Sequence, residues 1–108
     1  MPDEDSKRAA HRALVDRILS GEGRATTEQR ARAFGNEDLS PPLDTLIDKV
    51  VATPTQLTEA DLAAARASGF SEDQLFELVI CAVVGQSTRL YDAGLAALAE
   101  ATVDGRAE

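Results

Sequence analysis

Residues 58–85 decide the fold, and they read TEADLAAARASGFSEDQLFELVICAVVG. Thr58 is a typical N-cap and Gly69 is a typical helix stop, so this spacing predicts one helix between them. Ser71 and Gln74 form a capping box, which predicts that a second helix begins directly after it. Because no proline follows, we expect this second helix to continue to about residue 101.

The second of these helices contains the most apolar part of the chain. From residue 75 to 84 it is apolar on nearly every side, except at Glu77. A segment of this kind belongs in the centre of a bundle or in a subunit interface. Gly85 and Gly94 each weaken a helix by about 1 kcal/mol relative to Ala. Either they permit close helix packing, or the helix bends or breaks at Gly85.

Upstream, capping signals and apolar spacing predict three more helices, at residues 6–19, 27–34 and 41–51. Ser40 fits the N-cap of the last one, with Pro41 at the first helical position. Ala and Leu dominate the apolar residues and aromatic residues make up only 4% of the chain, so we expect an all-α fold. The prediction is a small bundle of about five helices with a long apolar C-terminal helix. A single domain is expected, with a flexible tail at 1–5, an N-terminal helical segment at 6–35 and a helical core at 36–108.

Charge and cysteine content exclude several classes of protein. The formal net charge is -8, and residues 33–108 hold thirteen acidic residues against four basic ones, which disfavours nucleic-acid binding. Residues 1–32 hold seven basic and six acidic residues. They form either a solvated helix face or an arm that docks on an acidic body, its own or a neighbour's. One cysteine closes no intramolecular disulfide, no apolar run spans a bilayer and no leader opens the chain, so we expect a cytoplasmic protein.

The pattern of residues 58–85 resembles the carboxymuconolactone decarboxylase and alkyl-hydroperoxidase D-like (AhpD-like) superfamily. In that family a helix ends in a small residue and glycine, and an acidic capping segment then opens a long apolar helix. The matching pieces here are Ser68-Gly69-Phe70 followed by Ser71-Glu72-Asp73-Gln74-Leu75. The resemblance covers about residues 43–100. It implies an all-helical subunit that forms a homo-oligomer, with the long helix at the interface.

Redox members of this family carry a Cys-x-x-Cys-x-x-x-His motif before the glycine turn. The resemblance places that motif at Pro54, Leu57 and Asp61 of this sequence, so both thiols and the histidine are replaced. Peroxidase or disulfide-reductase activity is therefore not expected, and no cofactor is implied.

Two residues inside the apolar segment invite a chemical interpretation. Cys81 is either a small core residue or the sulfenic-acid former of a one-cysteine peroxidase, and core packing is favoured because no histidine lies nearby in sequence. Glu77 is either a general acid or base, or a carboxylate that reaches solvent or pairs across an interface. We expect Arg89, from another helix or another subunit, to be its partner.

A polar cluster follows the apolar segment. Gln86, Arg89 and Tyr91, with Thr88, form either a ligand site, in which Arg89 clamps a carboxylate, or an intersubunit network in which Arg89 pairs with Asp92. His11 is expected at the surface. It is the chain's only histidine, and no His, Cys and Asp cluster predicts a metal site.

The sequence therefore predicts a redox-inactive helical protein with a structural, ligand-binding or partner-binding role in a homo-oligomer. Two alternatives remain open: a cofactor-free lactone decarboxylase or isomerase that uses Glu77 and Arg89, and a non-catalytic subunit that joins an active AhpD-like homologue. We expect the following interface residues: Leu75, Leu78, Val79, Val83 and Leu90.

Overall fold

The computed structural model describes residues 2–103, with side chains from Ser6 to Thr102. Within this range the chain is helical and contains no strand. The elements are α1 (Pro2–Ser20), α2 (Thr27–Gly35), α3 (Leu43–Ala52), the short 3₁₀ helix η1 (Pro54–Gln56), α4 (Glu59–Ala67) and α5 (Glu72–Val103). The all-α prediction and the number of α-helices are confirmed. The predicted tail and core extend to Met1 and to residues 104–108, which lie outside the described residues.

Local capping explains three of the helix starts. The Thr26 hydroxyl accepts from the backbone N–H of Gln29, and the Gln29 side chain accepts from the backbone N–H of Thr26. Thr58 and Asp61 make the same reciprocal pair at the start of α4. Ser71 and Gln74 repeat it at the start of α5, with bonds of 2.8 and 3.1 Å. These exchanges satisfy backbone donors that a helix leaves unpaired.

The starts of α1 and α3 differ from the prediction. α1 begins at Pro2, four residues earlier than expected. α3 begins at Leu43, and its N-cap is Pro42, without a side-chain cap from Ser40. The physical reason is the second proline, because a residue that precedes proline is disfavoured in the α region, and Pro41 is such a residue.

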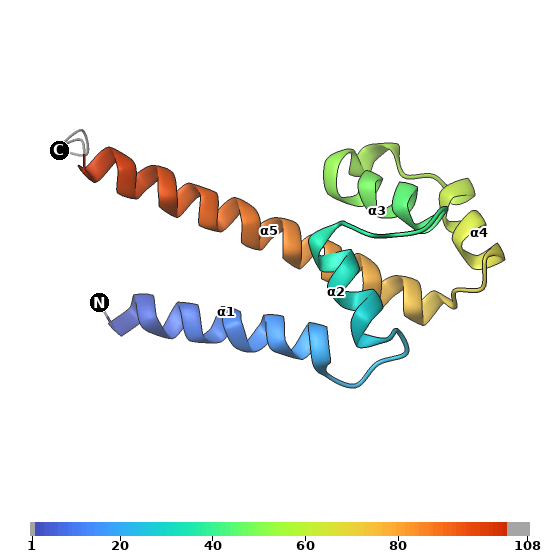
Figure 1. Cartoon of the computed structure of the whole chain (residues 1–108), viewed down its shortest axis with the longest axis horizontal. Coiled ribbons are helices and arrows are strands. Elements are labelled where there is room, and N and C mark those ends of the chain that lie inside the picture. The colour runs from blue at the N-terminus through green and yellow to red at the C-terminus, as the bar shows by residue number, and fades with distance from the viewer. Residues whose placement is uncertain (1, 104–108) are drawn as a thin grey trace.

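The first half of α5 is the centre of the fold, and α2 and α3 pack against it (Figure 1). The largest fully buried side chains are Leu46, Ile47, Leu78 and Cys81. α5 runs unbroken through Gly85. A Cβ added at Gly85 would lie 2.8 Å from the carbonyl carbon of Phe34 in α2, and closer still to the oxygen. Gly85 therefore permits close helix packing, which decides between the two predicted roles.

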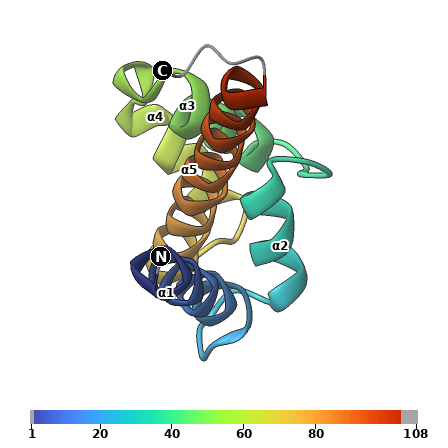
Figure 2. The same cartoon turned by 90° about the vertical axis from the view of Figure 1, so that its left-hand side faces the viewer.

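The second half of α5 extends away from this core and α1 diverges from it, so that the start of α1 and the end of α5 lie at the same end of the molecule (Figures 1 and 2). The molecule measures 54 × 29 × 21 Å, and its radius of gyration is 16.7 Å. A compact chain of this length has a radius of gyration of about 13 Å. The molecule is therefore elongated. α5 is long, as expected, but its apolar residues occupy only part of its length and only some of its sides. Phe76 and Val83, inside the segment predicted to lie in a bundle centre or a subunit interface, are exposed within the single chain.

Candidate functional site

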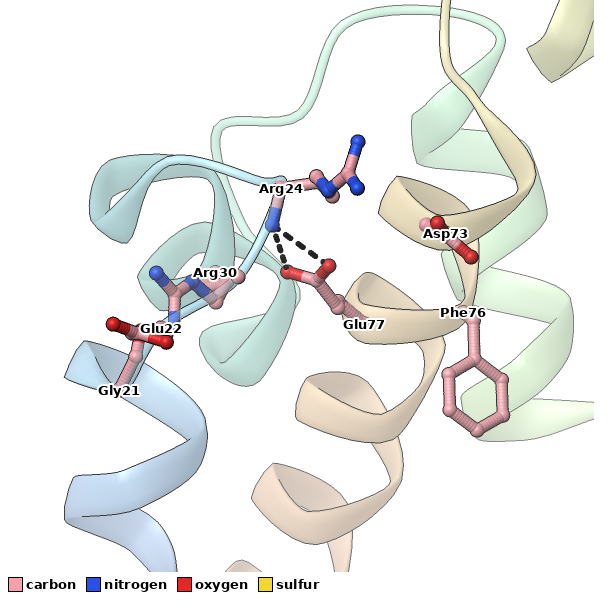
Figure 3. Close-up of a pocket in the computed structure, with 8 residues that line it drawn as sticks. Gly21, Glu22, Arg24, Arg30, Asp73, Phe76 and Glu77 are labelled. Atoms are coloured by element: carbon pink, nitrogen blue, oxygen red, sulfur yellow. Dashed lines mark hydrogen bonds between the residues drawn. The ribbon is translucent and has the colours of Figure 1, made fainter.

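Glu77 lies where α5 meets the loop between α1 and α2 (Figure 3). Its two carboxylate oxygens accept from the backbone N–H of Arg24 at 2.9 and 2.8 Å, and one also accepts from the N–H of Ala25 at 3.1 Å. Gly23 permits this approach, because a Cβ there would lie 3.0 Å from the Glu77 carboxyl carbon and closer to one oxygen. The carboxylate therefore fastens the loop to α5.

These contacts decide the protonation state of Glu77. Partial burial opposes its ionisation, but the N–H donors of Arg24 and Ala25 and the charges of Arg30 and Arg24 outweigh burial. Together they hold the pKa of Glu77 below its ordinary value. An ionised carboxylate whose oxygens already accept three N–H bonds is a poor general acid, so the geometry supports a structural role.

Arg30 is the one buried charged side chain among the described residues, and sequence reasoning did not identify it. Its Nε donates to the carbonyl of Ala25, and its Nη1 donates to the carbonyls of Ile18 and Gly21. It thus ties the end of α1 to the start of α2. An arginine within a charged N-terminal stretch looks like a surface residue, and no local signal marks it as buried.

A shallow pocket of about 650 Å³ opens beside this junction. Its lining includes Glu22, Arg24, Arg30, Asp73 and Glu77. The Phe76 ring, which also borders it, points away from the Glu77 carboxylate (Figure 3). The polar groups of Glu77 and Arg30 that reach this pocket are largely occupied by backbone partners, so they hold the fold together more than they offer a reactive centre.

The predicted partnership of Glu77 with Arg89 is not formed within the chain. Arg89 donates instead to the carbonyl of Phe34 at 2.7 Å and to the Gln86 side chain at 3.2 Å. Arg89, in α5, therefore holds the C-terminal end of α2 against α5. The expected pairing of Arg89 with Asp92 gives way to these contacts, because the α2 carbonyl lies within its reach.

His11 is half-buried, which corrects the expectation of a surface residue. Its Nε2 lies 2.9 Å from the Thr88 hydroxyl, which itself donates to the carbonyl of Val84 at 2.7 Å. Since the hydroxyl has one proton, the His11 Nε2–H must be the donor in the first bond. The His11 ring also lies 6.3 Å from the Tyr91 ring, centre to centre. These contacts pin α1 to α5.

Around the contact between His11 and Thr88, α1 and α5 form an open groove of about 810 Å³. Basic side chains from α1, including Lys7 and Arg12, line one wall. Tyr91 and Leu95 from α5 line the other. Of the predicted ligand residues, Tyr91 borders this groove, whereas Gln86 and Arg89 are absent from its lining. This groove therefore does not bring the three predicted ligand residues together.

The three positions that the resemblance to the AhpD-like family assigns to a redox motif lie in different elements. Pro54 lies in η1, Leu57 follows it, and Asp61 lies in α4, so the three positions do not share one helix. Asp61 accepts from Lys49 at 3.0 Å. The backbone N–H of Thr58 and the Lys49 charge lower the pKa of Asp61.

Cys81 is a core residue. It is 1% exposed, and its Sγ lies 3.5 Å from the carbonyl oxygen of Ile18, to which the thiol donates. Burial raises the pKa of its thiol, and Arg30 offsets this only in part. The unreactive core role is therefore favoured over peroxidase chemistry.

The predicted interface residues divide between two faces of α5. Leu75 and Leu78 are 4% and 0% exposed, so the chain's own core already uses them and they offer no surface to a second subunit. Val83 and Leu90 are 47% and 63% exposed, and Val79 is half-buried. Sequence reasoning did not separate these groups, because a helix that is apolar on all sides does not reveal which side its neighbours cover.

Val83 and Leu90 lie in line with Phe76, which is 67% exposed, at intervals of seven residues. Seven residues complete almost two helical turns, so these side chains project from the same side of α5, opposite the core. We call this side, with Val79, Gly94, Ala97 and Ala101, the outer face of α5.

Comparison with known proteins identifies no relative: no family model, no curated protein and no solved structure matches the chain. Among the described residues, no group of three or more His, Cys, Asp or Glu side chains could hold a metal ion. No helix in residues 2–103 combines the length and the apolar character that crossing a membrane requires.

Proposed function

We propose that this chain is a redox-inactive, AhpD-like helical protein that acts as a structural or partner-binding subunit of a homo-oligomer assembled through α5. The observation that carries this proposal is the outer face, where Phe76, Val83 and Leu90 expose about half to two thirds of their surface along one line. An exposed apolar surface of this kind marks an interaction site more often than a solvated surface. The pattern of residues 58–85 and the three replaced redox positions support the family and the lack of redox chemistry.

Burial of these side chains supplies a driving force of useful size. Full burial of a Leu, Val or Phe side chain contributes about 1.5–3 kcal/mol. For side chains that are already partly covered, about 1–2 kcal/mol each remains, or roughly 6–12 kcal/mol for the six side chains of two copies. Loss of translational and rotational freedom opposes this gain. Association is favourable when further contacts along the helices add to the burial energy and together they exceed this loss of freedom.

The shape of the molecule supports the same role. The second half of α5 extends away from the core (Figure 1), and Leu98 there is 60% exposed. Helices are marginal in water unless an apolar face packs against a neighbour. A second subunit would supply that neighbour.

Light scattering on the purified protein tests the proposal. We expect a mass of at least a dimer for the wild type. Val83→Glu places a charge on the outer face and should yield a monomer with unchanged helix content by circular dichroism. Ala96→Glu is the matched control, because Ala96 is exposed on another side of the same helix. This variant should retain the wild-type mass. A monomeric wild type at high protein concentration would overturn the proposal.

The two alternatives make different demands. A mixed oligomer would use the same face with an active, cysteine-bearing homologue. Co-purification of that homologue in a fixed ratio would support the mixed oligomer in place of the homo-oligomer.

The lactone decarboxylase or isomerase requires Glu77 and Arg89 to meet in one pocket. Within one chain they hold separate backbone partners, so no observation favours this enzyme.

A further inference from the structure

The groove between α1 and α5 carries positive charge on a protein whose net charge is -8. Lys7, Arg8 and Arg12 line it from α1, and Asp92 of α5 is the one carboxylate among its described lining residues. Residues four apart on a helix lie on the same side, as Arg8 and Arg12 do, so the cations face α5 together. The molecule as a whole repels an anion, but the local field of this groove attracts one.

Two of these cations have no partner of their own. Within residues 6–102, the side chains of Lys7 and Arg12 make no ion pair and no hydrogen bond, and both are exposed. The hydroxyl groups of Ser87 and Tyr91, which border the groove from α5, make no hydrogen bond to the described residues either. An ammonium, a guanidinium and two hydroxyls are therefore available to donate to a carboxylate.

The groove also offers apolar surface. Its walls meet where His11 donates to Thr88, and Thr88 donates in turn to the Val84 carbonyl, so these polar groups are already satisfied. Beside them, Leu95 is half-buried and Tyr91 is 45% exposed. A ligand that brings only charge, such as phosphate, leaves this hydrocarbon surface in water. A ligand with an apolar body removes it from water, as the occupants of most small-molecule sites do.

We propose that the groove binds an amphiphilic anion, namely an aliphatic carboxylate of about ten carbons. Its carboxylate pairs with Lys7 and Arg12, and its chain lies along Tyr91 and Leu95. This site is separate from the outer face of α5, because Val83 and the other residues of that face do not line it. Ligand binding here goes beyond the proposed function and does not depend on it.

The dimensions of the groove set the length of the ligand. Its lining extends from Lys7 to Val15 on α1 and from Ser87 to Leu95 on α5, which is about 12 Å along each helix. An extended chain advances about 1.2 Å per bond, so about ten carbons fill this length. The volume of about 810 Å³ is within the range of small-molecule pockets. Longer chains would project beyond the groove into water.

Tyr91 supplies a fluorescent probe at the site, because it is the chain's only tyrosine and the chain has no tryptophan. Decanoate is titrated into the full-length protein below the concentration at which it forms micelles. Tyrosine fluorescence and calorimetry should both saturate at one ligand per chain. Octanoate should bind about tenfold more weakly, because each buried CH₂ group contributes about fourfold. Dodecanoate should bind no more than about twofold more tightly than decanoate, since its added carbons remain in water.

Charge variants test the contacts of the carboxylate. Arg12→Gln should weaken decanoate binding about threefold, and Lys7→Gln in the same chain should extend the loss to about tenfold. Arg17→Gln is the matched control and should bind as the wild type does, because Arg17 lies on α1 outside the lining of this groove. Decanol has the same chain without the charge, and it should bind at least about tenfold more weakly than decanoate.

Several outcomes would overturn the proposal. The first is the absence of saturable decanoate binding. The second is equal affinity for decanol and decanoate, or an equal loss from Arg12→Gln and Arg17→Gln, because the cations of the groove would then not select the ligand. The third is heat of binding without a change in Tyr91 fluorescence, which would place the ligand elsewhere.

Two further arms separate this site from other surfaces. Binding to phosphatidylglycerol vesicles by a protein that does not bind free decanoate would assign the basic wall to a membrane surface and overturn the proposal. Val83→Glu leaves the groove unchanged, so this variant should bind decanoate as the wild type does. A monomeric wild type that binds decanoate would therefore remove the proposed function and support the ligand site.

Discussion

The substitution Gly85→Ala tests the packing on which the position of α2 depends. Alanine should stabilise an ideal helix by about 1 kcal/mol relative to glycine. At Gly85, however, the added methyl group would lie 2.8 Å from the carbonyl carbon of Phe34 and closer to its oxygen, and real Cβ atoms essentially never approach within 3.0 Å. The obstacle is backbone, which no rotamer change relieves, so α2 or α5 must shift.

The expected effect follows from these opposing terms. Overpacking a close contact costs about 1–3 kcal/mol, and the shift also disturbs the bond that Arg89 makes to the same carbonyl. We therefore expect Gly85→Ala to lower the free energy of unfolding by about 1–2 kcal/mol after the gain in helix propensity. For a domain of this size that corresponds to a melting temperature roughly 5–10 °C lower.

Urea unfolding followed by circular dichroism measures this effect, at a low protein concentration so that association contributes little. Gly94→Ala is the matched control in the same helix, because a Cβ there meets nothing within 4 Å. It should raise the free energy of unfolding by about 0.5–1 kcal/mol. Equal stabilisation by both substitutions would refute the close approach of α2 to α5.

Three further predictions follow from the polar contacts. Glu77→Gln should lower stability at pH 7 by about 1 kcal/mol. The pKa of Glu77 is depressed in the folded state, so its contribution is present above its ordinary value of 4.5 and lost as pH falls through the folded value. Urea titrations at several pH values should show that the free energy of unfolding falls less with acid in the variant than in the wild type. An equal fall in both proteins would contradict the role of Glu77. Cys81, whose thiol pKa is raised by burial, should react with a thiol reagent at pH 7 at least tenfold faster in urea than in the native protein, and equal rates would place it at the surface. Arg89→Ala should lower the melting temperature by several degrees without changing the mass measured by light scattering, because Arg89 binds within its own chain; a lower mass would assign it to an interface.

Much of the fold could be predicted because its signals are local. The capping boxes at Thr26, Thr58 and Ser71 join residues three positions apart, so the sequence contains both partners. The predicted start of α3 was wrong because the restriction that Pro42 imposes on Pro41 outweighed the capping preference of Ser40. The candidate site was predicted less well. Glu77 was recognised as an unusual charge, yet its partners are backbone groups 52 and 53 residues away.

The sequence by itself determined that the chain is helical and where most of its helices begin. Helix propensity, capping and residue identity suffice for these conclusions, because each acts within a few positions of the chain. Only the tertiary structure decided which side of α5 is buried. It directed Leu75 and Leu78 into the core and left Phe76, Val83 and Leu90 outside. It also joined Arg89 to Phe34 and His11 to Thr88. These outcomes depend on which distant segments meet, and no spacing within one helix encodes that choice.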